Sequence, residues 1–366
     1  MNKRALVISG VKWDATYQRH HLNTKILAKN GYKVDFLEGC KTSKMSLKKI
    51  IGLLGEKLRN FSVQNKDNSL VKNARSDINV FSLFFLPPGG FFSSQINGLL
   101  FNIFHFRRLA TNYDLILIYT PSDHVKFLNV DDSYLIYDCV RAFSVWGGYH
   151  KSLYENEKLL FSKAHKVTCD SFYLKDIHLP ELVEEVKISH LIPPLEVELT
   201  NYSYSLSNDI KVIGYFGSVS DHIDITIFDK LLESGYEIHF WGVDDEGLLP
   251  EKVVNHGYVS DQKELFAQLS LYCCALIIPY KYVLDGVYPA KLAISLATRL
   301  PVFSSKFYDS KKLSNMLYVY DNMEGLLKML NGYNIEEHNN KIEEINLFVE
   351  GIDIDSYTSR FNSTYE

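Results

Sequence analysis

The stretch "CCALIIPYKYVLDGVYPAKLAISLATRLPVFSS", residues 273–305, holds a short apolar run, a helical pattern and a second apolar run. Residues 273–280 and 300–305 predict buried β-strands, and residues 289–299 predict a helix between them. A strand, a helix and a second strand in succession are typical of a parallel sheet that is covered by helices. The stretch therefore predicts an α/β fold.

The same alternation continues outward from this stretch. It runs from the first residues to about residue 195, and it restarts at residue 210. Residues 261–270 predict a further helix, and Asp261 is suited to be its N-cap residue. The other predicted strands cover residues 4–10, 32–39, 78–87, 114–121, 133–140, 165–171, 188–194, 210–218, 236–244 and 253–260, and the other predicted helices cover residues 17–31, 149–164 and 224–235.

A polar stretch rich in Ser and Asn, residues 196–209, separates the two series. It has no apolar period and predicts a linker. We therefore expect two Rossmann-like, doubly wound α/β domains that face a cleft, with a hinge near residues 195–209. Ligands of such sheets bind outside the carboxyl ends of the strands, so this cleft is the expected site.

Composition narrows the class of protein. Of the 366 residues, 46% are hydrophobic and 23% are charged, which is typical of a globular chain. The net charge of -5 gives no reason to expect a nucleic-acid partner. Five cysteines, without metal-ligand spacing, predict a reducing compartment without disulfides. The N-terminus predicts a first strand rather than a signal peptide, and no apolar run is long enough for a spanning helix. We expect a cytoplasmic protein.

Four stretches, spread over most of the chain, carry a resemblance to a known family. They are residues 10–39, in which Trp13, Gln18 and Arg19 match a W…QR pattern, "LIYDCVRAFS" at 135–144, "VIGYFGSVSDHID" at 212–224, and residues 256–305. In order and spacing they resemble the GT-B glycosyltransferases, in particular bacterial polysaccharide-assembly transferases of the teichuronic-acid and xanthan glucuronosyltransferase type.

The resemblance implies a division of labour between the domains. Residues 1–195 would bind the acceptor, with Trp13 and Arg19 among the contacts. Residues 210–345 would bind a nucleotide-sugar donor, UDP-linked by preference. Residues 346–366 would end in a helix that packs back on the first domain.

The donor diphosphate needs a cation and backbone N–H groups. Lys291 follows Pro289 at the start of a predicted helix, where free amides and a lysine together form an anion site. The turn at Gly217 and Ser218 has small residues that let backbone amides approach a diphosphate. Tyr258 or Val259 is expected against the base.

Two departures from the family pattern concern the donor's hydroxyl groups. The family usually has Glu three residues after the lysine, where this chain has Ile294, and Gly just before "xPV", where it has Arg299. Asp285 or Tyr288, in the loop before the helix, are the candidates to bind the hydroxyl groups instead. Another departure is Arg141, which stands where an acidic residue is common.

Activation of an acceptor requires a base near neutral pH. Asp14, Asp138 and His20 are the candidates for this role. His21, the neighbour of His20, points in another direction on a helix. No acidic pair stands in a loop typical of a metal site, the nearest being "NVDDS" at 129–133, so we expect neither a metal nor a cofactor.

A basic amphipathic pattern covers residues 44–61. One side of the predicted helix is apolar, and Lys48, Lys49 and Lys57 lie among the residues around the rest. Residues 84–108 are rich in aromatic side chains and end in two arginines. A helix packed on its own domain and a helix at a membrane surface both fit such patterns.

These features predict a glycosyltransferase that is peripherally bound to the inner leaflet of the cytoplasmic membrane and acts on a lipid-linked glycan. Two alternatives remain: a sugar-nucleotide epimerase of similar fold, or a non-catalytic module that binds nucleotide-sugars.

Overall fold

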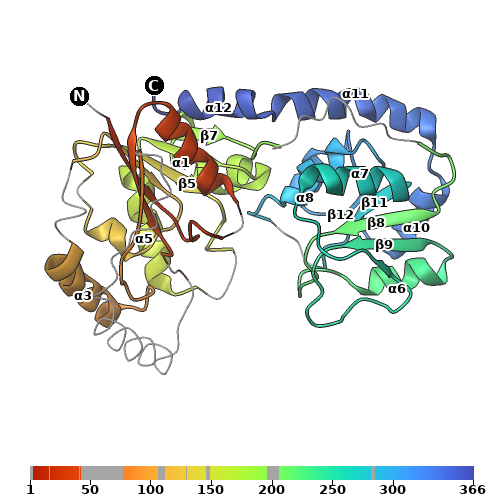
Figure 1. The fold of residues 1–366 in the computed structure, drawn as a ribbon, viewed down its shortest axis with the longest axis horizontal. Coiled ribbons are helices and arrows are strands. Elements are labelled where there is room, and N and C mark those ends of the chain that lie inside the picture. Colours follow the sequence, from red (N-terminus) through yellow and green to blue (C-terminus); the bar gives the residue numbers. More distant parts are fainter. Residues whose placement is uncertain are drawn as a thin grey trace. The chain divides into compact units, whose positions relative to one another are not determined.

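The structure, a computed structural model, describes residues 3–15, 17–40, 42, 77–105, 112–128, 130–145, 149–195, 206–281 and 285–366. The chain divides into two compact units, each with its own sheet (Figure 1). The first unit comprises Met1–Cys169, His178–Ser189 and Phe361–Glu366, and the second comprises Asp170–Ile177 and His190–Arg360. The predicted basic helix, residues 44–61, and the linker residues 196–205 lie outside the described residues.

The first unit is built on a seven-stranded sheet with the order β3-β2-β1-β4-β5-β6-β7. The pairings from β3 through β6 are all parallel, as the alternation of strands and helices predicted. The order from β3 to β6 is that of a Rossmann sheet. The strands are β1 Arg4–Ile8, β2 Lys33–Glu38, β3 Ile78–Ser82, β4 Leu115–Ile118, β5 Tyr134–Cys139, β6 Lys166–Cys169 and β7 Ile188–His190.

Strand β3 corrects one sequence expectation. The apolar run 78–87 predicted a buried strand, but β3 ends at Ser82 and is half-buried or exposed along its length. The reason is its position at the edge of the sheet, where β2 is the only strand that pairs with it among the described residues.

The helices of the first unit begin and end where local signals place them. The Gln18 N–H donates to His21 Nδ1 (3.0 Å) at the start of α1, and Gly31, with φ of +86°, follows its end. The helices are α1 Arg19–Lys29, α3 Phe91–Leu100 and α5 Lys151–Lys163, and the short turns are η1 Phe101–His105 (π), η2 Asp123–Lys126, η4 Leu179–Glu181 and η5 Glu185–Lys187 (3-10).

The second unit repeats the Rossmann order in a six-stranded sheet, β10-β9-β8-β11-β12-β13. All of its pairings are parallel. The strands are β8 Val212–Phe216, β9 Glu237–Trp241, β10 Val254–Asn255, β11 Ala275–Ile278, β12 Val302–Ser305 and β13 Tyr318–Tyr320.

Side-chain caps start several helices of the second unit. Asp261 accepts the Glu264 N–H (3.0 Å) at the start of α7, as predicted, and Asn322 caps α10 in the same way. The helices are α6 Thr226–Glu233, α7 Gln262–Tyr272, α8 Ala290–Ala297, α9 Tyr308–Lys312, α10 Met323–Asn331, α11 Ile335–Gly351 and α12 Ile354–Asn362, and the π turn η3 Leu174–His178 lies earlier in the chain.

The last residues of the chain belong to the first unit. Asn30, just after α1, donates to Asn362 Oδ1 and to Tyr365 Oη (2.9 Å each). The Tyr134 hydroxyl, on β5, donates to the carbonyl of Thr364 (2.9 Å). These bonds attach the C-terminal residues to the sheet and to the first helix of this unit.

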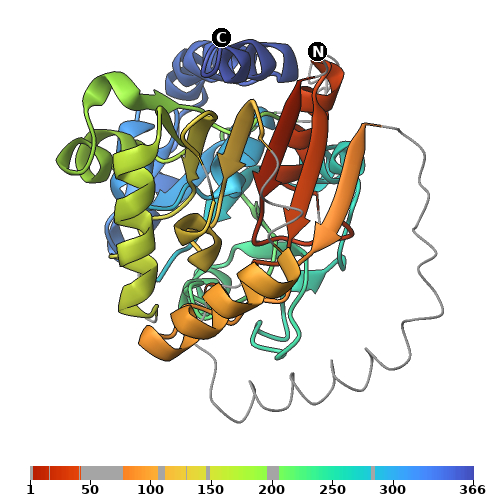
Figure 2. The ribbon, with the colours of Figure 1, turned by 90° about the vertical axis from the view of Figure 1, so that its left-hand side faces the viewer.

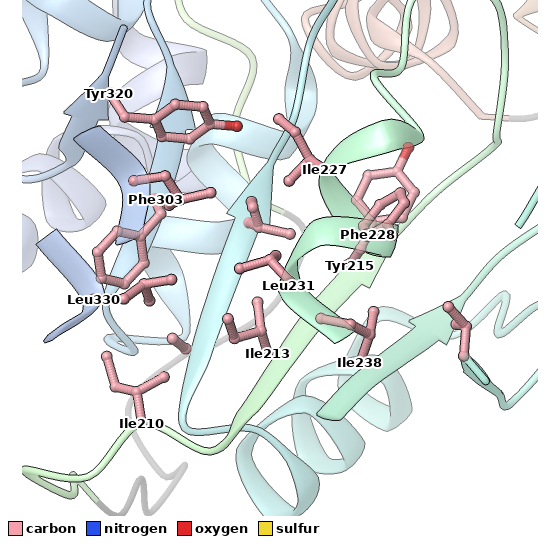
Figure 3. Packing of buried hydrophobic residues seen from close by; sticks show 14 of the residues in the cluster. Ile210, Ile213, Tyr215, Ile227, Phe228, Leu231, Ile238, Phe303, Tyr320 and Leu330 are labelled. Carbon is pink, nitrogen blue, oxygen red and sulfur yellow. The ribbon is translucent and has the colours of Figure 1, made fainter. Parts of the chain in front are cut away.

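The core of the second unit lies between its sheet and the helices α6 and α10 (Figure 3). Alternate residues of β8, Ile213 and Tyr215, point into it because side chains two apart share one face of a strand. The Tyr215 ring packs on Phe228 and Phe240, with centroids 5.4 and 5.7 Å away. The core therefore fixes the position of the Tyr215 ring.

Within the part of the chain that the structure describes, no helix is both long and apolar enough to cross a membrane. Figure 2 shows the first unit from its side, with α3 at the margin of the unit.

Candidate active site

Three glycine turns follow three neighbouring strands at the carboxyl edge of the second sheet. Gly217 (φ +108°) follows β8, Gly242 follows β9, and Gly257 (φ +77°) follows β10. The Gly242 N–H donates to the Gly257 carbonyl (2.9 Å). A Cβ atom on Gly242 would collide with the carbonyl of Gly217, and one on Gly217 would collide with the side chain of Lys291. Glycine is therefore required for the backbone and Lys291 to lie this close together.

Lys291 is the second residue of α8, which begins after Pro289. Its Nζ donates to Tyr215 Oη (2.8 Å) and lies 4.6 Å from the centre of the Tyr215 ring and 5.7 Å from that of Tyr280. Burial lowers the pKa of Lys291 to about 8. No carboxylate forms an ion pair with it among the described residues. The lysine therefore remains largely protonated at neutral pH, and the part of the chain that is described supplies no carboxylate to balance its charge.

Tyr215 connects the lysine to the glycine turn. Its hydroxyl donates to the carbonyl of Ser218 (3.0 Å), which leaves an oxygen lone pair for Lys291. Figure 3 shows this hydroxyl at the margin of the core cluster. Sequence reasoning missed Tyr215 as part of the site. The available signal was its place in a strand, one residue before Phe216 and two before the glycine turn.

The arrangement is suited to binding an anion. The first amides of α8 lack partners inside the helix, and the helix dipole favours negative charge at this end. The ammonium of half-buried Lys291, which has no carboxylate partner among the described residues, adds a positive charge that is only partly screened by water and so acts on a nearby anion.

The other residues predicted for this unit differ in exposure. Tyr258 is 65% exposed, and Val259 is half-buried in the loop after β10. Tyr288 is only 6% exposed, and among the described residues its hydroxyl has no hydrogen-bond partner. Burial, followed by the negative charges of Asp309 and Asp170, raises the pKa of Tyr288 well above its ordinary value. Its hydroxyl therefore stays protonated.

The two departures from the family pattern lie on or just after α8. Ile294 is half-buried on the helix. Arg299, where glycine is usual, still has the left-handed backbone that glycine favours, with φ of +61°. Its side chain donates to Asn346 Oδ1 (2.8 Å), and its carbonyl bonds to His338 Nε2 (2.9 Å). Contacts with α11 thus hold Arg299 in a strained conformation.

At the carboxyl edge of the first sheet, two predicted residues pair with each other. Arg19 Nη2 lies 2.9 Å from Asp138 Oδ1, and their side chains are 6% and 1% exposed. Asp138 lies one residue before the end of β5 and Arg19 begins α1, so the pair ties the helix to the sheet. A carboxylate committed to a guanidinium is poorly placed to take a proton from an acceptor.

His20 lies beside this ion pair and is buried. Its Nδ1 is 2.8 Å from Ser9 Oγ, and its ring stacks on Tyr119 with centroids 3.8 Å apart. The Ser9 hydroxyl also donates to the Val11 carbonyl (3.0 Å), so its one proton is used and His20 donates from Nδ1. Burial, with the charges of Arg19 and His21, lowers the pKa of His20 to about 3. The ring is neutral, and Nε2 is its acceptor.

Trp13 and Asp14 lie in the loop between β1 and α1. The Trp13 N–H donates to Glu38 Oε2 (2.8 Å), and its ring makes an edge contact with Phe36. His21 closes the loop, since its Nδ1 accepts from Gln18 and its Nε2 bonds to the Lys12 carbonyl (3.1 Å). Asp14 is exposed.

Residue 129 of "NVDDS", the sequence nearest to a metal site, lies outside the described residues. Within the residues that are described, no group of three or more His, Cys, Asp or Glu side chains is placed to hold a metal ion.

Comparison with known proteins identifies the architecture. No family model and no curated protein matches the sequence. Sucrose-phosphate synthase from Thermosynechococcus elongatus has a TM-score of 0.67 at 12% identity, covering 99% of this chain and 98% of that one. HepE from Anabaena, in complex with UDP and glucose, has a TM-score of 0.66 at 12% identity, covering 99% of both chains. The chain has the GT-B fold.

A third structure of this architecture is the apo form of the lipopolysaccharide outer core galactosyltransferase WaaB. Its TM-score is 0.63 at 12% identity, and the match covers 99% of this chain and 98% of that one. The expected fold class, with two Rossmann-like domains, is thereby confirmed. At such low identity a shared GT-B fold does not assign an activity.

Proposed function

We propose that this protein is a GT-B glycosyltransferase that moves a sugar from a UDP-linked donor to a lipid-linked glycan at the cytoplasmic face of the bacterial membrane. The observation that carries the proposal is Lys291, a half-buried lysine at the start of α8 without a carboxylate partner among the described residues. A transferase must bind the donor's diphosphate and stabilise the charge that develops on the leaving nucleotide.

The geometry of the second unit supports a diphosphate ligand. Lys291 faces the turn after Gly217, and the free amides of α8 lie beside it. The turns after β9 and β10 place Tyr258 and Val259 at the same edge of the sheet, where a base would extend from the phosphates. The HepE structure, which contains UDP, shows that this fold accommodates such a ligand.

Calorimetry with UDP, GDP, CDP and CMP tests the donor site. We expect UDP to bind most tightly and Lys291→Ala to weaken it by about 1.5–3 kcal/mol, the range for a hydrogen bond to a charged group. The matched control is Lys263→Ala, because Lys263 is the second residue of α7 and is exposed. If wild type binds none of these nucleotides, or if both variants bind UDP equally well, the assignment of the donor site to Lys291 is wrong.

Ile294 bears on the choice of sugar. A carboxylate at this position would accept hydrogen bonds from donor hydroxyls, and isoleucine does not. We propose that the phenol of Tyr288, or Asp285, takes over part of this contact, and that phosphate binding is unaffected. Ile294→Glu should then change the preference among UDP-sugars while leaving the affinity for UDP within about threefold. A loss of UDP binding would show that the apolar site does not tolerate the charge.

In the first unit, we assign the base to Asp14. Asp138 is paired with Arg19, and His20 is buried with its Nδ1 bonded to Ser9 and its ring stacked on Tyr119, whereas Asp14 is exposed in the loop. His20 Nε2 is better suited to accept a hydrogen bond from an acceptor hydroxyl. Asp14→Asn should lower kcat by about 10²-fold or more and leave UDP binding unchanged. Equal activity of Asp14→Asn and wild type would contradict this assignment.

The lipid-linked acceptor places the reaction in surface polysaccharide synthesis, such as that of a capsule or an O-antigen. The teichuronic-acid and xanthan type stays a prediction from the sequence. Incubation with radiolabelled UDP-sugars and a polyprenyl-diphosphate saccharide should move label into the organic phase. Interconversion of the free UDP-sugar would indicate an epimerase, and nucleotide binding without any turnover would indicate a binding module.

A further inference from the structure

Helix α3, Phe91–Leu100, which the turn η1 continues, has an inverted polarity. The side chains of α3 that are buried are polar, Ser93 and Asn97. Its exposed side chains are apolar except for Gln95, whereas η1 buries Phe101 and exposes both Asn102 and Ile103. A helix that packs on its own domain shows the opposite pattern, because burial of the apolar face is what holds it there.

Polar contacts hold the inner face of α3. The Asn97 side chain, which is fully buried, accepts from the Leu86 N–H (2.8 Å) and donates to the Leu86 carbonyl (2.9 Å) and to Asp123 Oδ2 (2.7 Å). Asp123 also accepts from Asn156 Nδ2 (3.0 Å), on α5, and pairs with Lys126 (3.2 Å). The helix is therefore fixed in this orientation by satisfied hydrogen bonds.

The outer face is a stripe of large apolar side chains. Phe92, Ile96, Leu99 and Ile103 follow one another at intervals of four, three and four residues, and Phe91 stands beside the first. Their exposed fractions are 82%, 44%, 59%, 60% and 74% in that order. Asp77 and Arg107 bound a stretch of sequence that contains no Asp, Glu, Lys or Arg, although 23% of the chain is charged.

The flanking sequence indicates what covers this stripe. Residues 41–108 contain eleven Lys and Arg against three Asp and Glu, a net charge of +8 in a chain whose total is -5. Apolar side chains within a strongly basic region are typical of proteins that bind anionic lipid surfaces. Five residues on one helix fall short of the roughly 20–30 residues a side of a stable protein interface.

We propose that the outer face of α3 and η1 inserts into the interfacial layer of an anionic phospholipid bilayer. Insertion would remove five exposed apolar side chains from water, and the positive charge of the flanking sequence favours an anionic surface. The face lies on the first unit, and α3 follows β3, so it is near the carboxyl edge of the sheet where His20 and the Arg19–Asp138 pair lie. This inference rests on the polarity of one helix and holds whatever chemistry the protein performs.

A tryptophan placed on the stripe reports insertion directly. In Phe92→Trp, vesicles of phosphatidylglycerol and phosphatidylcholine should shift the emission to the blue, and brominated lipids should quench it. The matched control is Leu347→Trp, on α11, because Leu347 is 66% exposed. It should show neither effect. A blue shift that appears without vesicles and grows with protein concentration would instead indicate a second copy of the chain as the partner and overturn the proposal.

Sedimentation with the same vesicles measures the contribution of the stripe. Phe92→Ser combined with Leu99→Ser should lower the partition coefficient by about tenfold or more. The control, Leu271→Ser combined with Leu347→Ser, removes two leucines that are 75% and 66% exposed on the second unit and should bind vesicles like wild type. Equal losses in both double variants, or no vesicle binding by wild type, would overturn the proposal.

Two further measurements separate this inference from the proposed activity. UDP binding and the melting temperature should be unchanged in both double variants, since neither pair of residues belongs to the donor site. A protein that binds vesicles but no nucleotide would leave this inference standing and remove the proposed function. Lys48→Glu, Lys49→Glu and Lys57→Glu, combined, should weaken binding mainly at low salt, because salt screens the electrostatic part of the attraction.

Discussion

Two cations, one in each unit, are held in opposite ways, and of the two Arg19 is buried and Lys291 half-buried. In the first unit Arg19 is paired with Asp138 at 2.9 Å. In the second unit Lys291 bonds to the neutral phenol of Tyr215 at 2.8 Å, and no ion pair with it is formed by the described residues. A charge that forms an ion pair within the protein supports the folded state, because removing its partner would leave a buried charge without compensation. A cation without an ion-pair partner in the protein lowers the stability of the folded state. It is expected at a site where a bound ligand supplies the negative charge.

The largest expected effect comes from breaking the matched pair. Arg19→Met should destabilise the first unit by about 3–5 kcal/mol, because it leaves the buried Asp138 carboxylate without the guanidinium that balances its charge. The double variant Arg19→Met, Asp138→Leu should recover most of this loss. Urea denaturation followed by circular dichroism measures both. A double variant as unstable as the single one would show that the pair acts through more than its charges.

Replacing Lys291 by methionine should change the free energy of unfolding in the opposite direction. Lys291→Met should stabilise the protein without ligand by about 1–3 kcal/mol at pH 7, because folding lowers the pKa of Lys291 to about 8 and thus disfavours its charged form. The cost of this charge falls as the pH rises from about 8 toward the ordinary pKa of lysine. The stability of wild type should therefore approach that of Lys291→Met at high pH.

Thermal melts at pH 7 and pH 10 test this prediction, with Lys263→Met as the control for removing a charge at a helix start. UDP binding must be lost together with the gain in stability. A Lys291→Met protein that is less stable than wild type at pH 7 would show that Lys291 contributes to the fold, like Arg19.

The unmatched cation should also make donor binding depend on pH. Between pH 7 and pH 9 the affinity of wild type for UDP should fall about tenfold, because Lys291 loses its proton near pH 8 and only the ammonium attracts the diphosphate. Calorimetry with Lys291→Ala should give a weaker and nearly constant affinity over this range. If both proteins lose affinity in parallel, another group is responsible.

The smallest expected effect concerns the backbone that follows α8. Arg299 has φ of +61°, which glycine adopts without strain and alanine does not. Both Arg299→Gly and Arg299→Ala lose the bond to Asn346, so their difference reports the backbone alone. The glycine variant should be more stable than the alanine variant by about 1 kcal/mol in urea denaturation. Equal stability would mean that the loop relaxes around the substitution.

Periodic and local signals determined much of the fold. Alternating strands and helices predicted parallel sheets, and the restart at residue 210 predicted a second series of elements. Asp261 predicted the start of α7, and Pro289 with Lys291 predicted a cationic helix start. These predictions were possible because the periods of strands and helices and the demands of helix ends act over a few neighbouring residues.

Only the tertiary structure decided how distant residues meet. Arg19 and Asp138 lie 119 positions apart, and Tyr215 and Lys291 lie 76 apart, so strand order and side-chain direction set both contacts. The sequence offered Arg19 for the acceptor and Asp138 for the base, and no local pattern shows that they pair with each other. Likewise, residues 84–108 show where the apolar side chains are, whereas the bonds of Asn97 to Leu86 and Asp123 decide which face of α3 is turned outward. The physical reason is that charge pairing and helix orientation depend on contacts between segments that lie far apart in the chain.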